Sequence, residues 1–252
     1  PAISNRITIA IIHYQTINKV KRLENSHSKH ITRSTTRLML SYGLGDAGTG
    51  LVATQFGFFL FKFFISAGLP VIIAGSLLML IKIWDAINDP LIGWLSDRTQ
   101  SRWGPRIPWM VAASLPLGFS LAAIWWTPSG SIINKTIYYS IISIVVMTAY
   151  TSINLPFSAL STEISENTSV RTRLNASRFT GSIIAGLTGL IIAGVVLGSE
   201  GSVNNEYFLM GKISGCIAVI TTLISCWGLA PFAKKARRPS AKVEAITLQF
   251  KR

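Results

Sequence analysis

The amino-acid sequence predicts an all-α membrane protein with six transmembrane helices, and three observations support this fold class. Hydrophobic residues make up 49% of the 252 residues, whereas charged residues make up only 13%, about half of their usual share in soluble domains. Six apolar stretches each approach the roughly 20 residues that a helix needs to cross a bilayer. The Lys and Arg residues are concentrated in alternate links between these stretches.

Short links that contain Gly and Pro separate the first four stretches. Gly68 and Pro70 break the first link, Gly104 and Pro105 break the second, and the third contains Pro128. A backbone that crosses lipid must satisfy its own hydrogen bonds, and the alternation expected of barrel strands is absent, so we expect helices. The expected spans are 40–64, 71–95, 109–126, 136–157, 177–197 and 208–232.

The basic residues predict the topology and the domain boundaries. They gather in an arm (1–37), in the second and fourth links and in a tail (233–252), whereas the other links hold almost none. This positive-inside pattern predicts an integral protein of the cell (inner or plasma) membrane with both termini in the cytoplasm. We expect a basic, disordered arm at 1–37, a six-helix bundle at 38–232 and a basic tail at 233–252. Because the charge of +14 is divided among separate links without interleaved aromatics, it does not indicate a nucleic-acid partner.

The chain lacks the residue patterns of common enzymes. Its three His residues are scattered in the arm, and its two Cys residues form no ligand cluster with His or with each other. There is no Ser–His–Asp arrangement and no phosphate-binding loop. We therefore predict that the protein is not an enzyme and uses no cofactor.

The second stretch, LLMLIKIWDAINDPLIGW, is unusual because it carries Lys82, Asp85, Asn88 and Asp89 within an apolar span. An acid at the centre of a membrane helix costs about 2.5–3.5 kcal/mol on insertion scales. At 100° per residue, Lys82, Asp85 and Asp89 share one face, which we expect to point into the bundle interior. A structural salt bridge from Lys82 to Asp85 is one interpretation, but it leaves Asp89 unpaired. Binding of a proton or of a small cation by the carboxylates and an amide oxygen is the favoured one.

Four motifs in a fixed order resemble those of a known family. They are YGLGDAGTG in the first stretch, IWDAINDPLIGWLSDRTQSRWGPRIPW across the second, NLPFSALSTEI after the fourth and RTRLNASRF before the fifth. Together they resemble the glycoside–pentoside–hexuronide:cation symporters of the major facilitator superfamily, the melibiose permease relatives, from about residue 37 to residue 231. The resemblance implies the N-terminal half of a major facilitator superfamily fold, built from two inverted three-helix repeats.

The resemblance also implies a site for the coupling cation, either Na⁺ or H⁺. The family's two cation-binding acids match Asp85 and Asp89, and its amide matches Asn88. Thr151 matches a fourth-helix hydroxyl associated with that site. Na⁺ is the metal ion that this site would bind, at Asp85 and Asp89.

The implied substrate site departs in part from the family pattern. Arg178 matches an Arg near the sugar pocket, Lys82 stands where the family usually has Arg, and Asn154 stands where melibiose permease has an acid. Melibiose permease also places a sugar-binding acid where this chain has Gly50. Asp46 is four residues earlier on the same helical face, and we leave open whether it binds substrate or acts as a cap or gate at the helix entry.

The second link resembles the gating loop of the superfamily. The matching residues are Gly93, Asp97, Arg98, Arg102, Gly104 and Arg106. Gly93 permits close helix approach, and Asp97 can meet a helix N-terminus or an Arg across the cytoplasmic seam. Arg171 and Arg173 are the candidate partners on that side, and the same charges also set the topology.

The resemblance implies half of a secondary active transporter that couples a cation to a sugar or glycoside by alternating access. Its partners would be the substrate, the coupling cation, the lipid bilayer, and either a missing C-terminal six-helix half or a second copy. Two alternatives remain open. One is a lipid or lysolipid transporter of the same fold, and the other is a truncated, non-transporting remnant or assembly subunit.

Overall fold

The computed structural model describes residues 36–165, 167–198 and 203–236. Residues 1–39 form one compact unit, of which only the helical residues 36–39 are described, and residues 40–252 form the other. Six helices in the described part are long and apolar enough to cross a membrane, which confirms the predicted fold class. The predicted arm lies almost wholly outside the described residues, and so does most of the predicted tail.

Five of the six spans are longer than hydropathy alone predicted, whereas the third keeps its predicted length of 18 residues. The first continues from residues 40–45 into α2 (Ala47–Gln55), a π-helical turn (Phe56–Leu60) and α3 (Phe61–Ser66). The others are α4 (Val71–Arg98), α5 (Ile107–Ile124), α6 (Ile132–Ile164), α7 (Thr168–Val196) and α8 (Val203–Ala236). Thus α6 ends at Ile164 rather than at residue 157, and α7 begins at Thr168 rather than at residue 177. Hydropathy identifies only the segment within hydrocarbon, whereas the helical hydrogen bonds continue into the polar interface.

Glycines with positive φ angles lie in the links between the first four spans, where the sequence predicted breaks. Gly68, Gly104 and Gly130 have positive φ angles of 89°, 90° and 129°, a backbone region that favours glycine. After α3, the backbone N–H groups of Gly68 and Leu69 donate to carbonyl oxygens of Ile65 and Phe64 at 2.9 and 3.1 Å. These bonds satisfy carbonyls that the helix end would otherwise leave without a donor.

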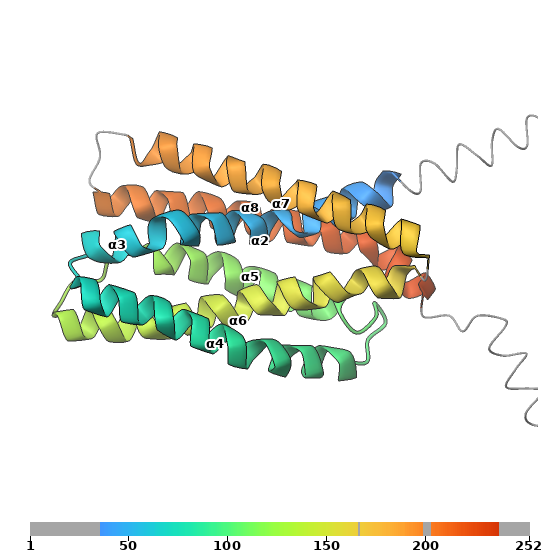
Figure 1. Cartoon of the computed structure of the whole chain (residues 1–252), viewed down its shortest axis with the longest axis horizontal. Coiled ribbons are helices and arrows are strands. Elements are labelled where there is room, and N and C mark those ends of the chain that lie inside the picture. The colour runs from blue at the N-terminus through green and yellow to red at the C-terminus, as the bar shows by residue number, and fades with distance from the viewer. Residues whose placement is uncertain (1–35, 166, 199–202, 237–252) are drawn as a thin grey trace, which may run out of the picture. The chain divides into compact units, whose positions relative to one another are not determined.

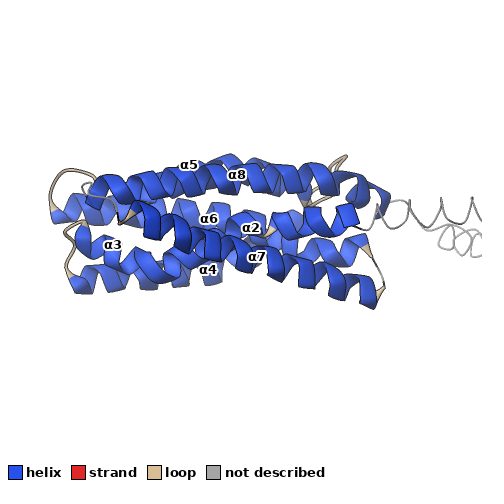
Figure 2. Cartoon of the chain, turned by 90° about the horizontal axis from the view of Figure 1, so that it is seen from above, coloured by secondary structure: helices blue, strands red, loops and turns tan. Residues whose placement is uncertain are grey.

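The helices run roughly side by side along one direction (Figures 1 and 2). The first span packs through α2 against α7, α4 packs against α6, and α5 packs against both α6 and α8. If spans one to three are exchanged with spans four to six, the α2–α7 pair (spans one and five) becomes the α6–α4 pair (spans four and two). The α5–α8 pair (spans three and six) becomes itself. This is the pairing expected of two three-helix repeats, and it brings α2, α6 and α7 together around the polar residues described below.

An aromatic cluster closes the end of the bundle at the link between α3 and α4. The ring centroid of Phe63 lies 5.2 Å from that of Trp125 and 4.9 Å from that of Tyr207. Tyr139 packs edge-on against Phe63 at 5.9 Å, and all four side chains are buried. Lys135 at the start of α6 donates to the carbonyl oxygen of Ala67 at 2.6 Å, which ties α6 to the link.

Two spans leave most of their apolar surface uncovered. In their most apolar windows, 22% of the residues of α4 and of α7 are buried, compared with 44–50% in the other four spans. Ile72 and Met79 on α4 and Ile191 and Val195 on α7 are among the exposed large side chains. In a membrane protein these surfaces face either lipid or another bundle of helices.

Candidate functional site

One carboxylate of the first span is neutralised inside the bundle. Asp46, the residue before α2, is buried, and its Oδ2 atom lies 3.1 Å from Nε of Arg178 on α7. The Nε–H bond does not point at this oxygen, so the contact is an ion pair without a hydrogen bond. Thr49 donates its hydroxyl to the other carboxylate oxygen, Oδ1, at 3.0 Å. The alternative that Asp46 caps the helix is wrong, because its side chain accepts no capping hydrogen bond from α2.

The guanidinium of Arg178 is held from α6 as well. Its Nη2 atom donates to Oδ1 of Asn154 at 2.9 Å, and Nδ2 of Asn154 donates to the hydroxyl oxygen of Tyr150 at 3.1 Å. The guanidinium carbon lies 5.6 Å from the ring centroid of Phe157 and 5.9 Å from that of Phe179, distances at which a cation is attracted to a ring face. Asn154 can make these contacts because an amide both accepts and donates, which a carboxylate does not.

Small residues allow the first span and α7 to approach closely enough for this ion pair. A Cβ atom added at Gly181 would lie 2.0 Å from the carbonyl oxygen of Gly43. Gly43 is three residues before Asp46, and Gly181 is three residues after Arg178, so this backbone contact lies beside the ion pair. A Cβ atom at Gly50 would lie 2.3 Å from the Ser182 hydroxyl. Any side chain at position 50 would therefore force the helices apart.

The carboxylates of α4 have no such cationic partner. Asp85 is half-buried and Asp89 is exposed. In the described part of the chain, no Lys or Arg nitrogen lies within 4.0 Å of either one. Thr151 donates its hydroxyl to Oδ1 of Asp85 at 3.5 Å, the outer limit of a hydrogen bond, and it also lies close to Asp89. Among the described residues no group of three or more His, Cys, Asp or Glu side chains could hold a metal ion.

The orientation of α4 differs from the sequence-based expectation. Its buried stripe includes Ile81, Asn88 and Ile92, so the charged residues lie at the edge of the stripe rather than in the bundle interior. Lys82 is exposed and forms no ion pair with Asp85 within the described residues, so the structure does not support the alternative interpretation of a Lys82–Asp85 salt bridge. The cause is that α4 packs on α6 through apolar side chains and leaves the charged edge uncovered. Asn88 is only 1% exposed, and its Nδ2 atom has no hydrogen-bond partner among the described residues.

Tyr150 connects the two groups of polar residues. Its hydroxyl accepts from Asn154, its ring lies within electrostatic range of both Asp46 and Asp85, and the next residue, Thr151, contacts Asp85. The structure therefore brings Asp46, Asn154 and Arg178 together and places Asp85 beside them through α6. It does not bring Lys82 to this group.

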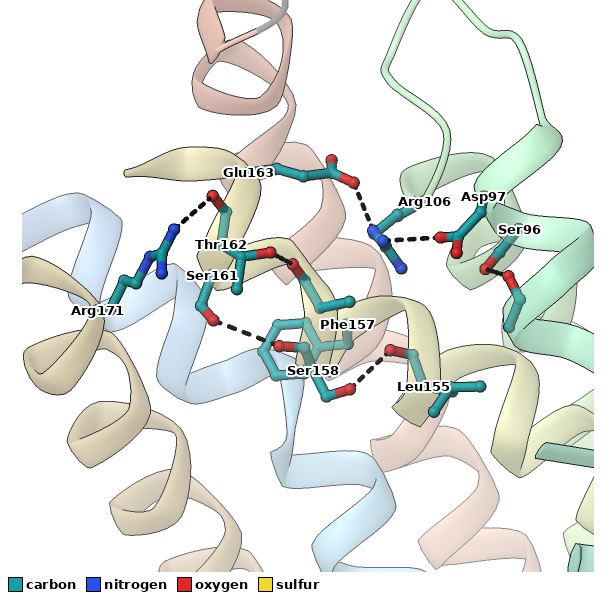
Figure 3. A network of polar contacts seen from close by, with 12 residues as sticks. Ser96, Asp97, Arg106, Leu155, Phe157, Ser158, Ser161, Thr162, Glu163 and Arg171 are labelled. Atoms are coloured by element: carbon teal, nitrogen blue, oxygen red, sulfur yellow. Dashed lines mark hydrogen bonds and ion pairs between the residues drawn. The ribbon is translucent and has the colours of Figure 1, made fainter. Parts of the chain in front are cut away.

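The gating-loop residues form a separate polar network at the end of the bundle where α4 and α6 terminate (Figure 3). Nη2 of Arg106 lies 2.8 Å from Oδ1 of Asp97, and Nε of Arg106 pairs with Glu163 near the end of α6. A cavity of about 580 Å³ lies beside this network, lined in part by Asp97, Thr99 and Glu163. Arg106 therefore joins the ends of α4 and α6.

The remaining predicted gate residues have distinct environments. A Cβ atom at Gly93 would lie 3.3 Å from a side-chain methyl of Leu155, which supports its expected role in close helix approach. Arg98 lies over the Trp94 ring at 4.1 Å, and Arg102 is exposed. Arg171, the predicted partner of Asp97, instead donates to the carbonyl oxygens of residues 165 and 162 at 2.7 and 3.4 Å, because the end of α6 presents free carbonyls there.

Sequence reasoning missed three residues of these networks. Thr49 lies three residues after Asp46 on the first span, a spacing that places two side chains on one helix face. Tyr150 precedes the predicted Thr151 and lies four residues before Asn154, so the same spacing rule was available. Glu163 is the acid of the NLPFSALSTEI motif, but its contact with Arg106 joins residues 57 positions apart, so the motif did not reveal this partner.

The chain is similar to proteins of one transporter family. Residues 41–249 match the family described as MFS/sugar transport protein. Over 207 residues, 79% of this chain, the sequence is 38% identical to an uncharacterised symporter of Synechocystis. A sodium-dependent lysophosphatidylcholine symporter of Xenopus tropicalis is 30% identical over 64% of the chain, and a glucuronide carrier protein homologue of Escherichia coli is 28% identical over 62%. The chain spans 38%, 31% and 34% of the lengths of these three relatives.

Proposed function

The chain belongs to the MFS/sugar transport protein family, and we propose that its six helices are the N-terminal half of a cation-coupled sugar symporter. It is an integral membrane protein by its six spans and its family. The single observation that carries the proposal is that Asp85 and Asp89 have no cationic partner in the described part of the chain. Placing an ionisable side chain within a membrane helix costs free energy, so such residues usually belong to ion or substrate pathways.

Asp85, Asp89, Asn88 and Thr151 are the proposed ligands of the coupling cation. Carboxylate, amide and hydroxyl oxygens are hard ligands suited to Na⁺, and two acids one helical turn apart would also hold a proton. We favour Na⁺, because the lysophosphatidylcholine relative is named as sodium-dependent. The cation is cargo of the transport cycle, and no cofactor is required.

The proposed substrate site is the group formed by Asp46, Asn154, Arg178 and Tyr150. Its charges cancel, so a neutral sugar would exchange hydrogen bonds with it without leaving a new buried charge unpaired. Lys82 is exposed at the edge of α4, and it would reach substrate only from the face that a second bundle covers. Because Tyr150 lies between the two groups, cation binding at Asp85 would alter the field at the substrate site.

We infer that a second six-helix bundle covers the exposed faces of α4 and α7. That bundle would be a further segment of the polypeptide, a separate chain or a second copy, and the two bundles would rock around the site between them. The Asp97–Arg106–Glu163 network would act as a gate by joining the ends of α4 and α6 in one state. Purified chain alone in liposomes should show no Na⁺-driven glycoside accumulation, and supplying the second bundle should restore it.

The topology of this proposal has its own test. We expect the protein to lie in the cell membrane with the α4–α5 link, the α6–α7 link and both termini in the cytoplasm. Lys and Arg residues concentrate in these four segments. In a variant with Cys216 and Cys226 replaced by Ser, an impermeant thiol reagent applied outside cells should label Ser129→Cys and spare Ser169→Cys. External labelling of Ser169→Cys would refute the topology.

Lysolipid transport is the second candidate, supported by the similarity to the lysophosphatidylcholine symporter. The acids of α4 fit both functions, so the substrate must decide between them. If free glycosides inhibit Na⁺-driven uptake of a labelled glycoside and lysophosphatidylcholine does not, the result would favour the sugar symporter. A chain that transports neither substrate even when joined to a second bundle would be a remnant or an assembly subunit.

A further inference from the structure

An apolar groove runs between α5 and α6 on the membrane-facing side of the bundle. It has a volume of about 370 Å³. Trp109, Ala112 and Pro116 line it from α5, and Val145 and Ala149 line it from α6. Alanine side chains create the groove, because they are shorter than the large apolar side chains on the same helices.

The groove faces away from the candidate substrate site. Thr148 and Ser152 of α6 line the groove, whereas Tyr150 and Asn154, each two residues further along, belong to the polar group around Arg178. Two residues correspond to about 200° of rotation on an α-helix, so these pairs lie on opposite faces of α6. Both helices are membrane spans, and the second bundle is inferred to cover α4 and α7 rather than α5. We therefore infer that the medium on the groove side is lipid.

The chemistry of the groove suits a hydrocarbon occupant. None of the described residues that line it is charged. The hydroxyls of Thr148 and Ser152 donate to carbonyl oxygens of their own helix at 2.8 and 2.7 Å. Nε1 of Trp109 donates to the Thr99 hydroxyl at 2.7 Å. Since the side-chain donors are already used, an occupant would gain mainly apolar contact.

The length and the position of the groove indicate at which of its two ends a lipid headgroup would lie. From Trp109 to Pro116, seven residues of α5 rise about 10 Å, which is most of one leaflet of a hydrocarbon core about 30 Å thick. Trp109 lies in the first turn of α5, next to the link that carries the exposed Arg102. Tryptophan is enriched at the headgroup level, and a basic residue there attracts lipid phosphate.

We propose that this groove binds one acyl chain of a phospholipid from the leaflet that meets the α4–α5 link. The lipid is a bound component of the outer surface of the bundle, separate from the transported substrate. Its headgroup lies at the level of Trp109 and Arg102, and its chain extends towards Pro116 and Val145.

Photo-crosslinking tests this proposal. The full chain is placed in nanodiscs that contain phosphatidylcholine with a diazirine in one acyl chain, and adducts are mapped by mass spectrometry after illumination. We expect residues 109–116 and 144–152 to carry about tenfold more adduct than the exposed apolar residues 183–195 of α7. Equal labelling of all exposed apolar surfaces would overturn the proposal.

Two variants distinguish the groove from general lipid contact. Ala112→Trp places an indole in the groove and should lower its adducts about tenfold. Leu115→Trp, at an exposed residue of the same helix outside the groove, should leave them unchanged. Val145→Trp blocks the groove from α6 and gives the same test if Ala112→Trp does not fold. Unchanged adducts in a folded blocking variant, or protein–protein adducts in place of lipid adducts, would contradict an acyl-chain site.

Discussion

The two groups of acidic residues in the bundle differ in how their charges are balanced. Asp46 has an arginine nitrogen at 3.1 Å and a hydroxyl donor at 3.0 Å. Asp85 has one hydroxyl at 3.5 Å, Asp89 stands beside it, and no cationic side chain within the described residues lies within 4.0 Å of either. In the first group the charges of Asp46 and Arg178 cancel. In the second group no described cationic side chain balances the negative charges of Asp85 and Asp89, so a cation from outside the bundle would balance them. This difference is the basis for assigning substrate binding to the first group and cation binding to the second.

The largest effect should come from breaking the balanced group. Arg178→Met leaves Asp46 buried without its partner and should lower the free energy of unfolding by about 3–5 kcal/mol. Thermal unfolding in detergent measures this loss. Adding Asp46→Asn to the same chain should recover most of it, because no uncompensated charge then remains. A double variant as unstable as the single one would show that the ion pair is not the cause.

A smaller effect should come from separating the helices that carry the pair. Gly181→Ala drives a methyl group into the backbone of Gly43 and should cost about 1–3 kcal/mol, as overpacking does. Gly194→Ala is the matched control on α7, because a Cβ atom there meets nothing within 4 Å, and Ala is the better helix former. Equal thermal stabilities of the two variants would contradict the close approach beside Arg178.

The smallest effect should come from the unbalanced group. Thr151→Val removes a buried hydroxyl that contacts Asp85 only at the outer limit of a hydrogen bond, and it should lower the free energy of unfolding by less than about 1 kcal/mol. Its effect should appear instead in Na⁺ affinity, with a loss of about three- to tenfold measured by calorimetry. Thr188→Val on α7, whose hydroxyl donates only to its own helix, should retain Na⁺ affinity. A Thr151→Val variant with unchanged affinity would exclude the hydroxyl as a ligand.

The fold was predictable because its signals are local. Hydropathy identified six spans, and Gly68 and Gly104 identified two of the links, because a membrane helix satisfies its hydrogen bonds within its own segment. The rotation of α4 was not predictable in the same way. Periodicity placed Lys82 and Asp85 on one face, but the direction of that face depends on the apolar contacts between α4 and α6.

The candidate site was predictable only where the motifs include it. The resemblance singled out Asp46, Asn154 and Arg178 separately, and the structure joins them across three spans. It included Glu163 in the NLPFSALSTEI motif but could not indicate its contact with Arg106, because that contact depends on where the ends of α4 and α6 meet. It also could not explain Gly50, whose role follows from the packing of Ser182 against the first span.

Na⁺ binding to the purified chain tests the central claim most directly. Calorimetric titration with NaCl, at ionic strength held constant with choline chloride, compares the unmodified chain with Asp85→Asn, Asp89→Asn and, as a control, Asp97→Asn. Asp97 is a carboxylate at the exposed end of α4, outside both groups. We expect saturable Na⁺ binding in the unmodified chain and in Asp97→Asn, and its loss in Asp85→Asn and in Asp89→Asn. Binding that persists unchanged in both of the latter variants would contradict the assignment of the cation to these two carboxylates.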